Sequence, residues 1–521
     1  MEDKLILALC LSALFVVVLS KLVSSAVKPR LNLPPGPWTL PLIGSLHHLA
    51  MTKSPQTHRS LRALSEKHGP IMQLWMGEVP AVVVSSPAVA EEVLKNQDLR
   101  FADRHLTATT EEIFFGGRDV IFGPYGERWR HLRKICMQEL LTAARVRSFR
   151  GVREGEVARL VRELAASAAG AGAGAVGAAA GVNLNERISK LANDIVMVSS
   201  VGGRCSHRDE FMEALEVAKK QITWLSVADL FPSSKLARMV AVAPRKGLAS
   251  RKRMELVIRR IIQERKDQLM DDSAAGAGEA AAGKDCFLDV LLRLQKEGGT
   301  PVPVTDEIIV VLLFDMISGA SETSPTVLIW TLAELMRNPR IMAKAQAEVR
   351  QAVAGKTTIT EDDIVGLSYL KMVIKETLRL HPPAPLLNPR KCRETSQVMG
   401  YDIPKGTSVF VNMWAICRDS RYWEDPEEYK PERFENNSVD YKGNNFEFLP
   451  FGSGRRICPG INLGVANLEL PLASLLYHFD WKLPNGMAPK DLDMHETSGM
   501  VAAKLITLNI CPITHIAPSS A

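Results

Sequence analysis

The feature that most constrains this chain is the segment at residues 451–460, where Cys458 lies among glycines and arginines just before an apolar stretch. Pro459 and Gly460 open that stretch, and its apolar residues recur at helical spacing. Cys458 is therefore expected at a helix N-terminus, where the helix dipole favours a thiolate. The glycines let backbone N–H groups and a flat ligand approach the sulfur. The segment predicts an iron-binding thiolate beside a planar cofactor; the alternative is a buried, inert cysteine in a glycine turn.

Five positions of this segment, Phe451, Gly454, Arg456, Cys458 and Gly460, match the haem-binding signature of the cytochrome P450 family. The chain therefore resembles that family. The resemblance implies a mainly α fold with a small β-rich part, in which haem b lies between a long central helix and the loop that carries Cys458. It also implies that Cys458 is the axial iron ligand and that Phe451 and Arg456 contact the cofactor.

Composition excludes several other classes of protein. The chain has 521 residues, of which 46% are hydrophobic and 23% charged, so it is long enough for a large core and is neither disordered nor fibrous. A net charge of +6 with no basic run among aromatics argues against a nucleic-acid partner. The eight cysteines include no CxxC pair, which is typical of a reducing compartment.

The N-terminus reads as a membrane anchor, because residues 5–20 are nearly all apolar and Lys4 and Lys21 flank them. A cleaved signal peptide is the alternative. Basic residues after the run place the following domain in the cytosol. We expect a single-pass anchor at residues 1–24, a basic, proline-rich hinge at 25–40 and a catalytic domain at 41–521, located at the endoplasmic reticulum membrane.

Residues 305–336 are expected to form one long helix that crosses the domain. Near its middle lie Ala320, Glu322, Thr323 and Pro325, which are unusual inside so apolar a helix, and the proline is expected to bend it. The segment is similar to the family's oxygen-activating motif, which implies catalytic roles for Glu322 and Thr323. Ala320 stands where the family usually has glycine, which would narrow the oxygen site.

Residues 126–134 read as a basic helix that places Trp129 and Arg133 on one face. In the family such a pair binds a haem propionate, and Arg390, further along the chain, is a second candidate for a propionate. Arginine suits a carboxylate because its guanidinium is bidentate. A solvated basic face is the alternative for the first pair.

Glu376 and Arg379 are three residues apart on a predicted helix, and Arg433 belongs to a downstream Pro-Glu-Arg-Phe segment. The resemblance implies that these three charges form a buried network. An ordinary surface pair, which would stabilise the fold little, is the alternative.

The substrate pocket is the least determined part. Residues 101–122 read as irregular, and the family's layout would place Phe114 and Phe115 over the pocket; a surface loop is the alternative. Leu386, Leu387 and Ala320 are further pocket candidates. The Ala/Gly-rich stretches 165–181 and 273–283 are expected to be loops.

The chain has no dinucleotide fingerprint, so the resemblance implies electrons from NADPH through a separate membrane-bound reductase. Acidic flavin domains suit a basic docking face. The candidate residues for that face are Arg128, Arg130, Arg145, Arg147 and Arg455.

The resemblance implies an NADPH- and O2-dependent monooxygenase of plant specialised metabolism that hydroxylates a hydrophobic small molecule. The amino-acid sequence as a whole is similar to those of grass enzymes that oxidise polycyclic, labdane-related diterpenes. A haem-thiolate isomerase or dehydratase, a haem-binding sensor or carrier, and an oxidase of a sesquiterpenoid or phenolic compound are the alternatives.

Overall fold

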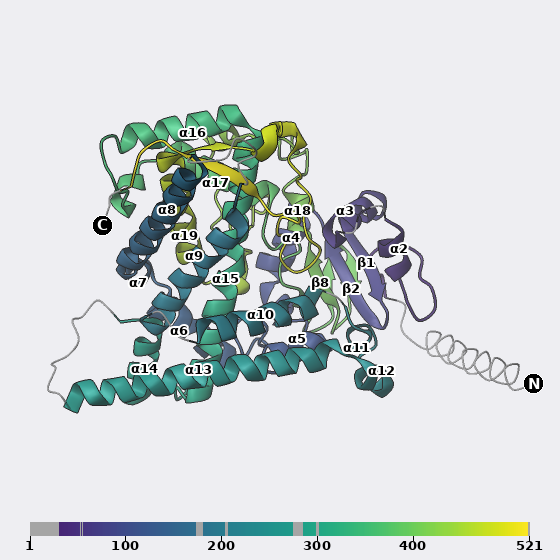
Figure 1. The fold of residues 1–521 in the computed structure, drawn as a ribbon. Helices are drawn as coiled ribbons and strands as arrows, with labels where there is room; N and C mark the ends of the chain where they lie inside the picture. Colours follow the sequence, from purple (N-terminus) through teal and green to yellow (C-terminus); the bar gives the residue numbers. More distant parts are fainter. Residues whose placement is uncertain are drawn as a thin grey trace, which may run out of the picture.

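The computed structural model describes residues 31–52, 54, 56–172, 181–203, 207–223, 225–274, 285–298 and 302–518. The chain is mainly helical with small sheets, as predicted (Figure 1). The expected anchor at residues 1–24 lies outside the described residues. The helices are α2 (Leu46–Met51), α3 (Thr57–His68), α4 (Pro87–Glu91), α5 (Ala108–Ile113), α6 (Glu127–Ile135), α7 (Ala143–Ser148), α8 (Arg150–Gly172), α9 (Leu184–Val201), α10 (Arg208–Thr223), α11 (Val227–Leu230), α12 (Lys235–Val240), α13 (Ala243–Ala274), α14 (Phe287–Glu297), α15 (Asp306–Arg337), α16 (Pro339–Ala352), α17 (Ser368–Leu380), α18 (Met413–Ile416) and α19 (Ile461–His478).

Helix α15 is the central element, as the long-helix prediction required. Thr305 caps it in an extended conformation, and Asp306 and Glu307 in the first turn favour the positive end of the helix dipole. An 18-residue window of this helix has a mean hydropathy of 1.3, which would suit a membrane span, but 72% of the window is buried inside the protein. It packs against α9, α13, α14, α16, α17 and α19. A helix that is apolar all round belongs in such a core.

Two separate hydrophobic cores meet along α15. Residues from Ile308 to Ile317 belong to one core, which α5, α6, α10, α13 and α14 complete. Residues from Val327 to Met336 belong to the other, which α8, α16, α17 and α19 complete. The turn between them, residues 318–323, carries the polar groups. The helix continues through Pro325, which provides no N–H for the Ser321 carbonyl.

The largest sheet has the strand order β1-β2-β8-β5-β3. Strand β2 pairs antiparallel with β1 and parallel with β8, while β5 pairs antiparallel with β8 and β3. A second sheet has the order β4-β10-β9, and β6 and β7 form a hairpin. The strands are β1 (Ile71–Met76), β2 (Val79–Val84), β3 (Asp103–Arg104), β4 (Val182–Asn183), β5 (Arg390–Lys391), β6 (Ser396–Val398), β7 (Tyr401–Ile403), β8 (Ser408–Val411), β9 (Phe479–Lys482) and β10 (Asn509–Thr514).

The described part of the hinge is fastened to the sheets. The Gln73 N–H donates to the Pro35 carbonyl at 2.8 Å, and the Asn32 N–H donates to Asp402 at 2.9 Å. A side chain at Gly36 would meet the Gln73 carbonyl oxygen at 2.1 Å, so only glycine fits there. The chain therefore enters the folded part of the molecule along β1.

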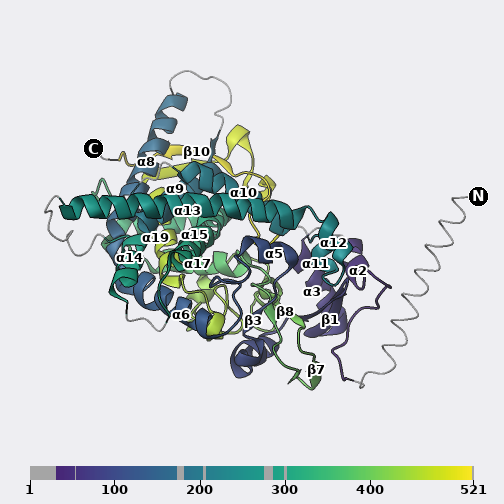
Figure 2. The same cartoon turned by 90° about the horizontal axis from the view of Figure 1, so that it is seen from below.

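Two loop predictions were partly wrong. Residues 101–122 contain β3 and α5, and a Thr107–Thr110 capping box begins that helix. The alanine-rich stretch from residue 165 continues α8 to Gly172, because alanine is the strongest helix former. The long helix α13 packs along α10 and against α5, and Figure 2 shows it lying across the molecule when seen from below.

Candidate active site

The loop that carries Cys458 is closed by a hydrogen bond from the Cys458 N–H to the Phe451 carbonyl at 2.9 Å. Gly460 is the N-cap of α19, as the sequence predicted. Burial raises the pKa of the Cys458 thiol, while the Gly460 N–H and the Arg133 guanidinium act in the opposite direction. These groups partly offset the cost of burying a thiolate, and a bound cation would remove the rest.

Glycine is required in this loop for steric reasons. Gly454 has a φ of +68°, and a side chain there would lie 2.2 Å from the Leu94 carbonyl oxygen. The loop therefore seats directly against the segment that carries Asp98. The buried Asp98 carboxylate accepts hydrogen bonds from the Arg455 N–H at 2.8 Å and from the Arg455 side chain at 3.0 Å.

Four arginines gather beside this loop. Arg104 and Arg390 are directly opposite each other in the register of β3 and β5. The pKa of Arg390 is lowered to about 10 and that of Arg456 to about 9, chiefly by burial, and neighbouring arginines act in the same direction. The pKa of Arg104 is also lowered, by burial first and then by Arg390, Arg456 and Arg133. Like charges placed opposite in a sheet are destabilising.

This cluster suits an anionic ligand. Arg390 is paired with Asp98 at 3.1 Å, but Asp98 is shared with Arg455, and Arg456 donates to the backbone carbonyls of Ala102 and Gly123. The buried positive charge thus exceeds the carboxylates that face it. A flat cofactor with two carboxylate arms, such as haem with its propionates, fits this donor set.

Trp129 and Arg133 lie on one face of α6, as predicted. The Arg133 guanidinium carbon is 5.4 Å from the Trp129 ring centre, and that of Arg456 is 4.0 Å away. Trp129 is buried and its N–H donates to the Val120 carbonyl at 3.0 Å. Arg133 donates to the Ile457 carbonyl at 2.6 Å, next to Cys458. The alternative of a solvated basic face is therefore wrong for this pair.

The middle turn of α15 is open, whereas the residues on either side of it, 308–317 and 324–336, are buried. Gly319 is exposed, Ala320, Glu322 and Thr323 are partly exposed, and nothing lies within 4 Å of a side-chain carbon built at Gly319. The Thr323 hydroxyl donates to the Gly319 carbonyl at 2.9 Å. Space for a ligand on this side of the helix is what the oxygen-site prediction requires.

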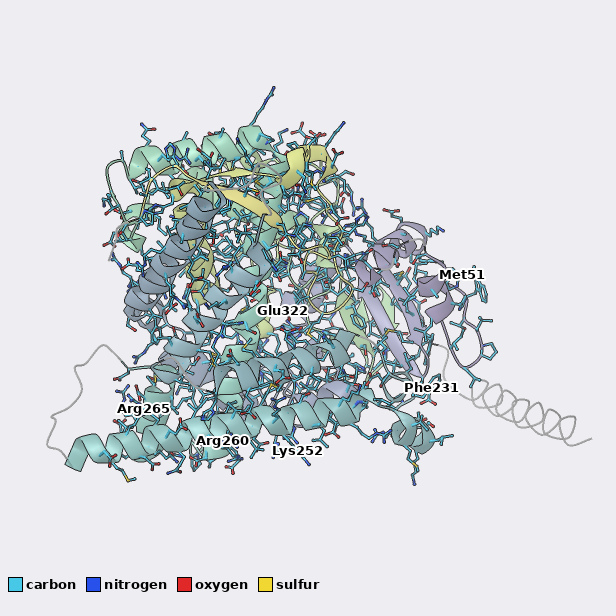
Figure 3. All side chains as sticks on the ribbon, viewed as in Figure 1. Met51, Phe231, Lys252, Arg260, Arg265 and Glu322 are labelled. Carbon is cyan, nitrogen blue, oxygen red and sulfur yellow. The ribbon has the colours of Figure 1, made fainter. Side chains whose placement is uncertain are left out.

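Glu322 is held in a mixed electrostatic environment. Burial raises the pKa of its carboxyl, Lys219 of α10 lowers it, and Glu216 raises it. The Lys219 ammonium is 3.8 Å from a Glu322 oxygen and also pairs with Glu216. Figure 3 places Glu322 near the middle of the molecule. An acid in this position can hold a proton for a neighbouring reaction.

Glu376, Arg379 and Arg433 form the predicted network, and the surface-pair alternative is wrong. Glu376 and Arg379 are wholly buried and make two hydrogen bonds, at 2.8 Å and 2.9 Å. Arg433 donates to the same carboxylate at 3.0 Å. Arg379 also donates to the backbone carbonyls of Cys417, Pro426 and Glu428, so all three charges are satisfied.

The pocket candidates are distributed over three hydrophobic cores. Phe114 and Phe115 are buried and contact Phe314 of α15 edge-on, with ring centres 5.7 Å and 5.2 Å apart, so a surface loop is excluded. Leu386 packs against the core of the N-terminal sheet, whereas Leu387 packs against the core around the second half of α15. Ala320 packs against the core that contains Phe114 and Phe115.

Sequence reasoning missed four residues that the fold adds to this region: Arg104, Asp98, Asp119 and Asp315. Each is buried or half-buried. Arg104, Asp98 and Asp315 are hydrogen-bonded to segments distant in sequence, whereas Asp119 accepts hydrogen bonds from Phe122 and Gly123 of its own loop. Buried charge was the only signal that could have found them, and it is not visible before the fold is known.

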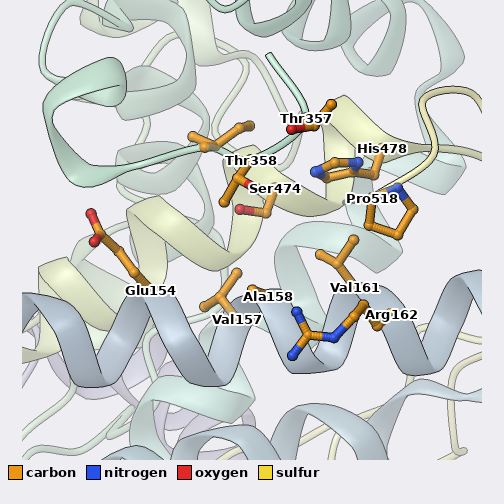
Figure 4. Close-up of a pocket in the computed structure, with 11 residues that line it drawn as sticks. Glu154, Val157, Ala158, Val161, Arg162, Thr357, Thr358, Ser474, His478 and Pro518 are labelled. Atoms are coloured by element: carbon orange, nitrogen blue, oxygen red, sulfur yellow. The ribbon is translucent and has the colours of Figure 1, made fainter. Parts of the chain in front are cut away.

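Two hollows lie away from this turn of α15. One, of about 20 Å³, lies between α8, α19 and the C-terminal segment and is lined by Val157, Val161 and His478 among others (Figure 4). It has room for about one water molecule. The other is an open hollow of about 310 Å³ on the side of α6, bordered by Arg130, Lys134 and Arg455.

Comparisons with known proteins agree on one family. The family described as cytochrome P450 matches residues 34–510. The ent-isokaurene C2/C3-hydroxylase of Oryza sativa subsp. japonica is 96% identical over 521 residues, which is 100% of both chains. The ent-cassadiene hydroxylase of the same plant is 89% identical over 100% of this chain and 99% of its own. The dolabradiene monooxygenase of Zea mays is 55% identical over 100% of both chains.

Proposed function

The chain belongs to the cytochrome P450 family, and we propose that it is a monooxygenase that hydroxylates a diterpene in plant specialised metabolism. Whole-length similarity to the ent-isokaurene C2/C3-hydroxylase carries this assignment. The ent-cassadiene hydroxylase, at 89% identity, has a different diterpene in its name. We therefore take ent-isokaurene, oxidised at C2 or C3, as the first candidate substrate and ent-cassadiene as the second.

Members of the family use a haem-thiolate iron and electrons that come from NADPH through a reductase. When bound, haem supplies the chemistry that inserts one atom of O2 into a C–H bond while the other atom leaves as water. We assign Cys458 as the residue that would bind its iron, because the loop holds the sulfur beside the Gly460 N–H and the Arg133 guanidinium. Arg133, Arg390 and Arg456 would hold the propionates, and Phe451 would flank the sulfur.

Glu322 and Thr323 are assigned to proton handling during turnover. The Thr323 hydroxyl is within 2.9 Å of the Gly319 carbonyl, so it can donate there and accept from a water on its open side. Burial raises the pKa of the Glu322 carboxyl, and the positive charge of Lys219 acts in the opposite direction. An isomerase or dehydratase that rearranges a peroxide needs neither group. The acid and hydroxyl on the open turn thus favour a monooxygenase.

The apolar wall near this turn suits a hydrocarbon. Phe114, Phe115 and Ala320 belong to the same core as the first half of α15, and none of the three side chains carries a charge. Sesquiterpenoid and phenolic substrates are smaller or more polar than a diterpene hydrocarbon. The size and polarity of the substrate are therefore the properties that a substrate panel tests.

We propose that the protein is attached to the endoplasmic reticulum membrane through residues 1–24, with the catalytic domain in the cytosol. An apolar surface supports the attachment. Leu236 and Met239 of α12 are 69% and 73% exposed, and Met51 of α2 is 77% exposed. Helix α11 joins this surface to the first sheet, because the Glu78 N–H donates to the Leu230 carbonyl. Figure 3 shows Met51 and Phe231 on the same side of the molecule.

The reductase is proposed to dock on the face formed by α6 and the Cys458 loop. Arg128, Arg130 and Arg147 are exposed there, whereas Arg145 is half-buried and bonded to the Asp285 carbonyl. Arg455 is exposed but also bonded to Asp98, so it contributes charge while serving the loop. A basic rim around the open hollow beside α6 is complementary to an acidic partner.

Co-expression with a plant reductase and a panel of diterpene synthases tests the proposed function. Hydroxylated ent-isokaurene or ent-cassadiene in extracts, together with NADPH-dependent oxygen uptake, is the expected result. Conversion of a peroxide substrate without NADPH would instead indicate an isomerase or dehydratase. Oxidation of only sesquiterpene or phenolic substrates would keep the monooxygenase class and reject the diterpene.

A further inference from the structure

Two buried aspartates, one on the first half of α15 and one in the loop before α6, lie close together. Asp315 lies on α15 and is 3% exposed, and Asp119 lies in the loop before α6 and is 1% exposed. Asp315 accepts a hydrogen bond from the Val120 N–H at 2.8 Å. Asp119 accepts from the N–H groups of Phe122 and Gly123, at 2.5 Å and 2.9 Å. The two carboxyls thus bind the N–H groups of a single short loop, residues 119–123.

The carbonyl groups of the same loop accept hydrogen bonds from the tryptophan and arginine side chains of the proposed haem site. The Val120 carbonyl accepts from the Trp129 N–H at 3.0 Å, and the Gly123 carbonyl accepts from Arg456. The Ile121 carbonyl accepts from Arg104 at 3.1 Å. Loop 119–123 therefore connects Asp315, four residues before Gly319, to Arg456, two residues before Cys458. Its position controls where the Trp129 and Arg456 side chains lie.

Each carboxyl has one buried oxygen with no hydrogen-bond partner among the described residues, Oδ2 of Asp119 and Oδ1 of Asp315. Two adjacent, buried and incompletely paired carboxylates would repel each other and lose their hydration. Arg456 and Arg104 face Asp119, but both are occupied by backbone carbonyls. Asp315 is faced by Asp119 and by the buried Cys136 thiol, neither of which is positive.

We propose that Asp119 and Asp315 retain one proton between them and act as positioning residues, a carboxyl latch that fixes loop 119–123 and hence the cofactor grip of Arg456 and Trp129. The effect on cofactor binding by Arg456 and Trp129 rests on the proposed haem site, whereas the shared proton of Asp119 and Asp315 does not. Burial supports the retained proton, because it raises the pKa of Asp119 to about 7 and that of Asp315 well above its usual range.

The sign of the pH dependence follows from these shifts. The closed loop holds a proton that an opened, hydrated loop would release, because the open-state pKa is near the ordinary aspartate value of about 3.9. For each pH unit above that value, the equilibrium constant for loop opening rises by up to tenfold, until the pH passes the raised pKa of the pair. The latch is strongest in mild acid and weakens as the pH rises through neutrality.

Asp315→Asn separates the latch from a merely structural contact. Its amide oxygen still accepts from Val120, and its NH2 donates to Asp119 in place of the retained proton. Asp119→Asn is the reciprocal variant, and Asp491→Asn, at an exposed carboxyl, is the matched control. Infrared spectroscopy on wild type is expected to show the carbonyl stretch of a protonated, buried carboxyl at neutral pH, and Asp315→Asn should lose it.

Amide hydrogen exchange of a peptide that covers 119–123 provides the second readout. After correction for the intrinsic exchange rates of the amides, the equilibrium constant for loop opening should rise between pH 6 and pH 8. The expected rise is up to tenfold per pH unit in wild type and in Asp491→Asn. In Asp315→Asn it should be flat, and haem retention should follow the same pattern. Absence of the band in wild type, or equal pH dependence in Asp315→Asn, would overturn the latch. If Asp315→Asn does not fold, the wild-type infrared titration and Asp119→Asn decide the same question.

These readouts are independent of the proposed function. Cys458→Ser should retain both the infrared band and the pH-dependent exchange, because Cys458 takes no part in the latch. A failure of haem assignment would therefore leave the latch intact, and a failure of the latch would leave the ligand assignment intact.

Discussion

The Arg433 Nε atom donates to Glu376 Oε1 at 3.0 Å, at a carboxylate that is wholly buried and already holds Arg379. This side chain joins helix α17 to the Pro431–Phe434 turn, and the Tyr369 hydroxyl of α17 donates a further hydrogen bond to Glu432 of the turn. The network lies on the same half of the protein as α19, so it supports the frame in which the Cys458 loop is held.

Glu376→Ala should prevent accumulation of folded, haem-loaded protein. It leaves two arginines near one vacated site, and breaking a buried pair typically costs about 3–5 kcal/mol. Holoprotein yield and Tm are the measurements. Lys95→Ala, which removes the exposed Lys95–Glu91 pair, is the control and should change stability by less than about 1 kcal/mol. Normal haem content in Glu376→Ala would show that the network is dispensable.

Thr323→Ala should keep haem content but divert electrons from product to peroxide and water. The hydroxyl that donates to Gly319 is lost, and with it the partner for a water on the open turn. The ratio of product to NADPH consumed is the measurement, with an expected fall of about tenfold or more. Thr323→Ser retains the hydroxyl and should keep most of the coupling. Equal coupling in all three proteins would remove Thr323 from proton handling.

Lys219→Gln and Glu216→Gln should shift the pH profile of turnover in opposite directions. Lys219 lowers and Glu216 raises the pKa of Glu322. If Glu322 must be ionised to relay a proton, the ascending limb should move to higher pH in Lys219→Gln and to lower pH in Glu216→Gln. The dependence of kcat on pH at saturating substrate is the measurement. Shifts of the same sign, or none, would exclude Glu322 as the titrating group.

Arg390→Ala should weaken haem binding more than Arg128→Ala does. Arg390 is buried between Asp98 and the Ser453 carbonyl, whereas Arg128 is exposed. A lost charge-assisted hydrogen bond corresponds to about 1.5–3 kcal/mol, or roughly ten- to a hundredfold in haem affinity. Transfer of haem to an excess of apomyoglobin is the measurement. Equal transfer rates in the two variants would place the propionates elsewhere.

Local patterns were sufficient for the central helix and the Cys458 loop, because glycine spacing and helical periodicity are properties of neighbouring residues. The fold class followed from the family resemblance that the Cys458 segment carries. The Glu376–Arg379 pair was also visible, since both residues lie on one helix. The partners of Arg390 were not visible, because Asp98 is distant in sequence and meets it only when η2, the 3₁₀ turn at Asp98–Phe101, and β5 approach.

The error at residues 101–122 has the same origin, whereas the error at residue 165 onward came from underrating the local helix propensity of alanine. The stretch at 101–122 lacked long periodicity, and α5 within it is held by tertiary contacts, including the bond from the Thr109 hydroxyl to Asp229 at 2.9 Å. The pairing of Asp119 with Asp315 could not be expected from composition, because burying two carboxyls together contradicts the usual preference for exposed acids. Such exceptions become informative only once burial is known.

The most direct test of the account is the carbon monoxide difference spectrum of the reduced protein, wild type against Cys458→Ser. Wild type should show the band of thiolate-bound haem, and Cys458→Ser should lose that band while the polypeptide is still produced. Cys417→Ser, at a buried cysteine whose thiol faces the Glu447 carbonyl, is the matched control and should keep the band. Persistence of the thiolate band in Cys458→Ser would contradict the account, because another residue would then have to bind the iron.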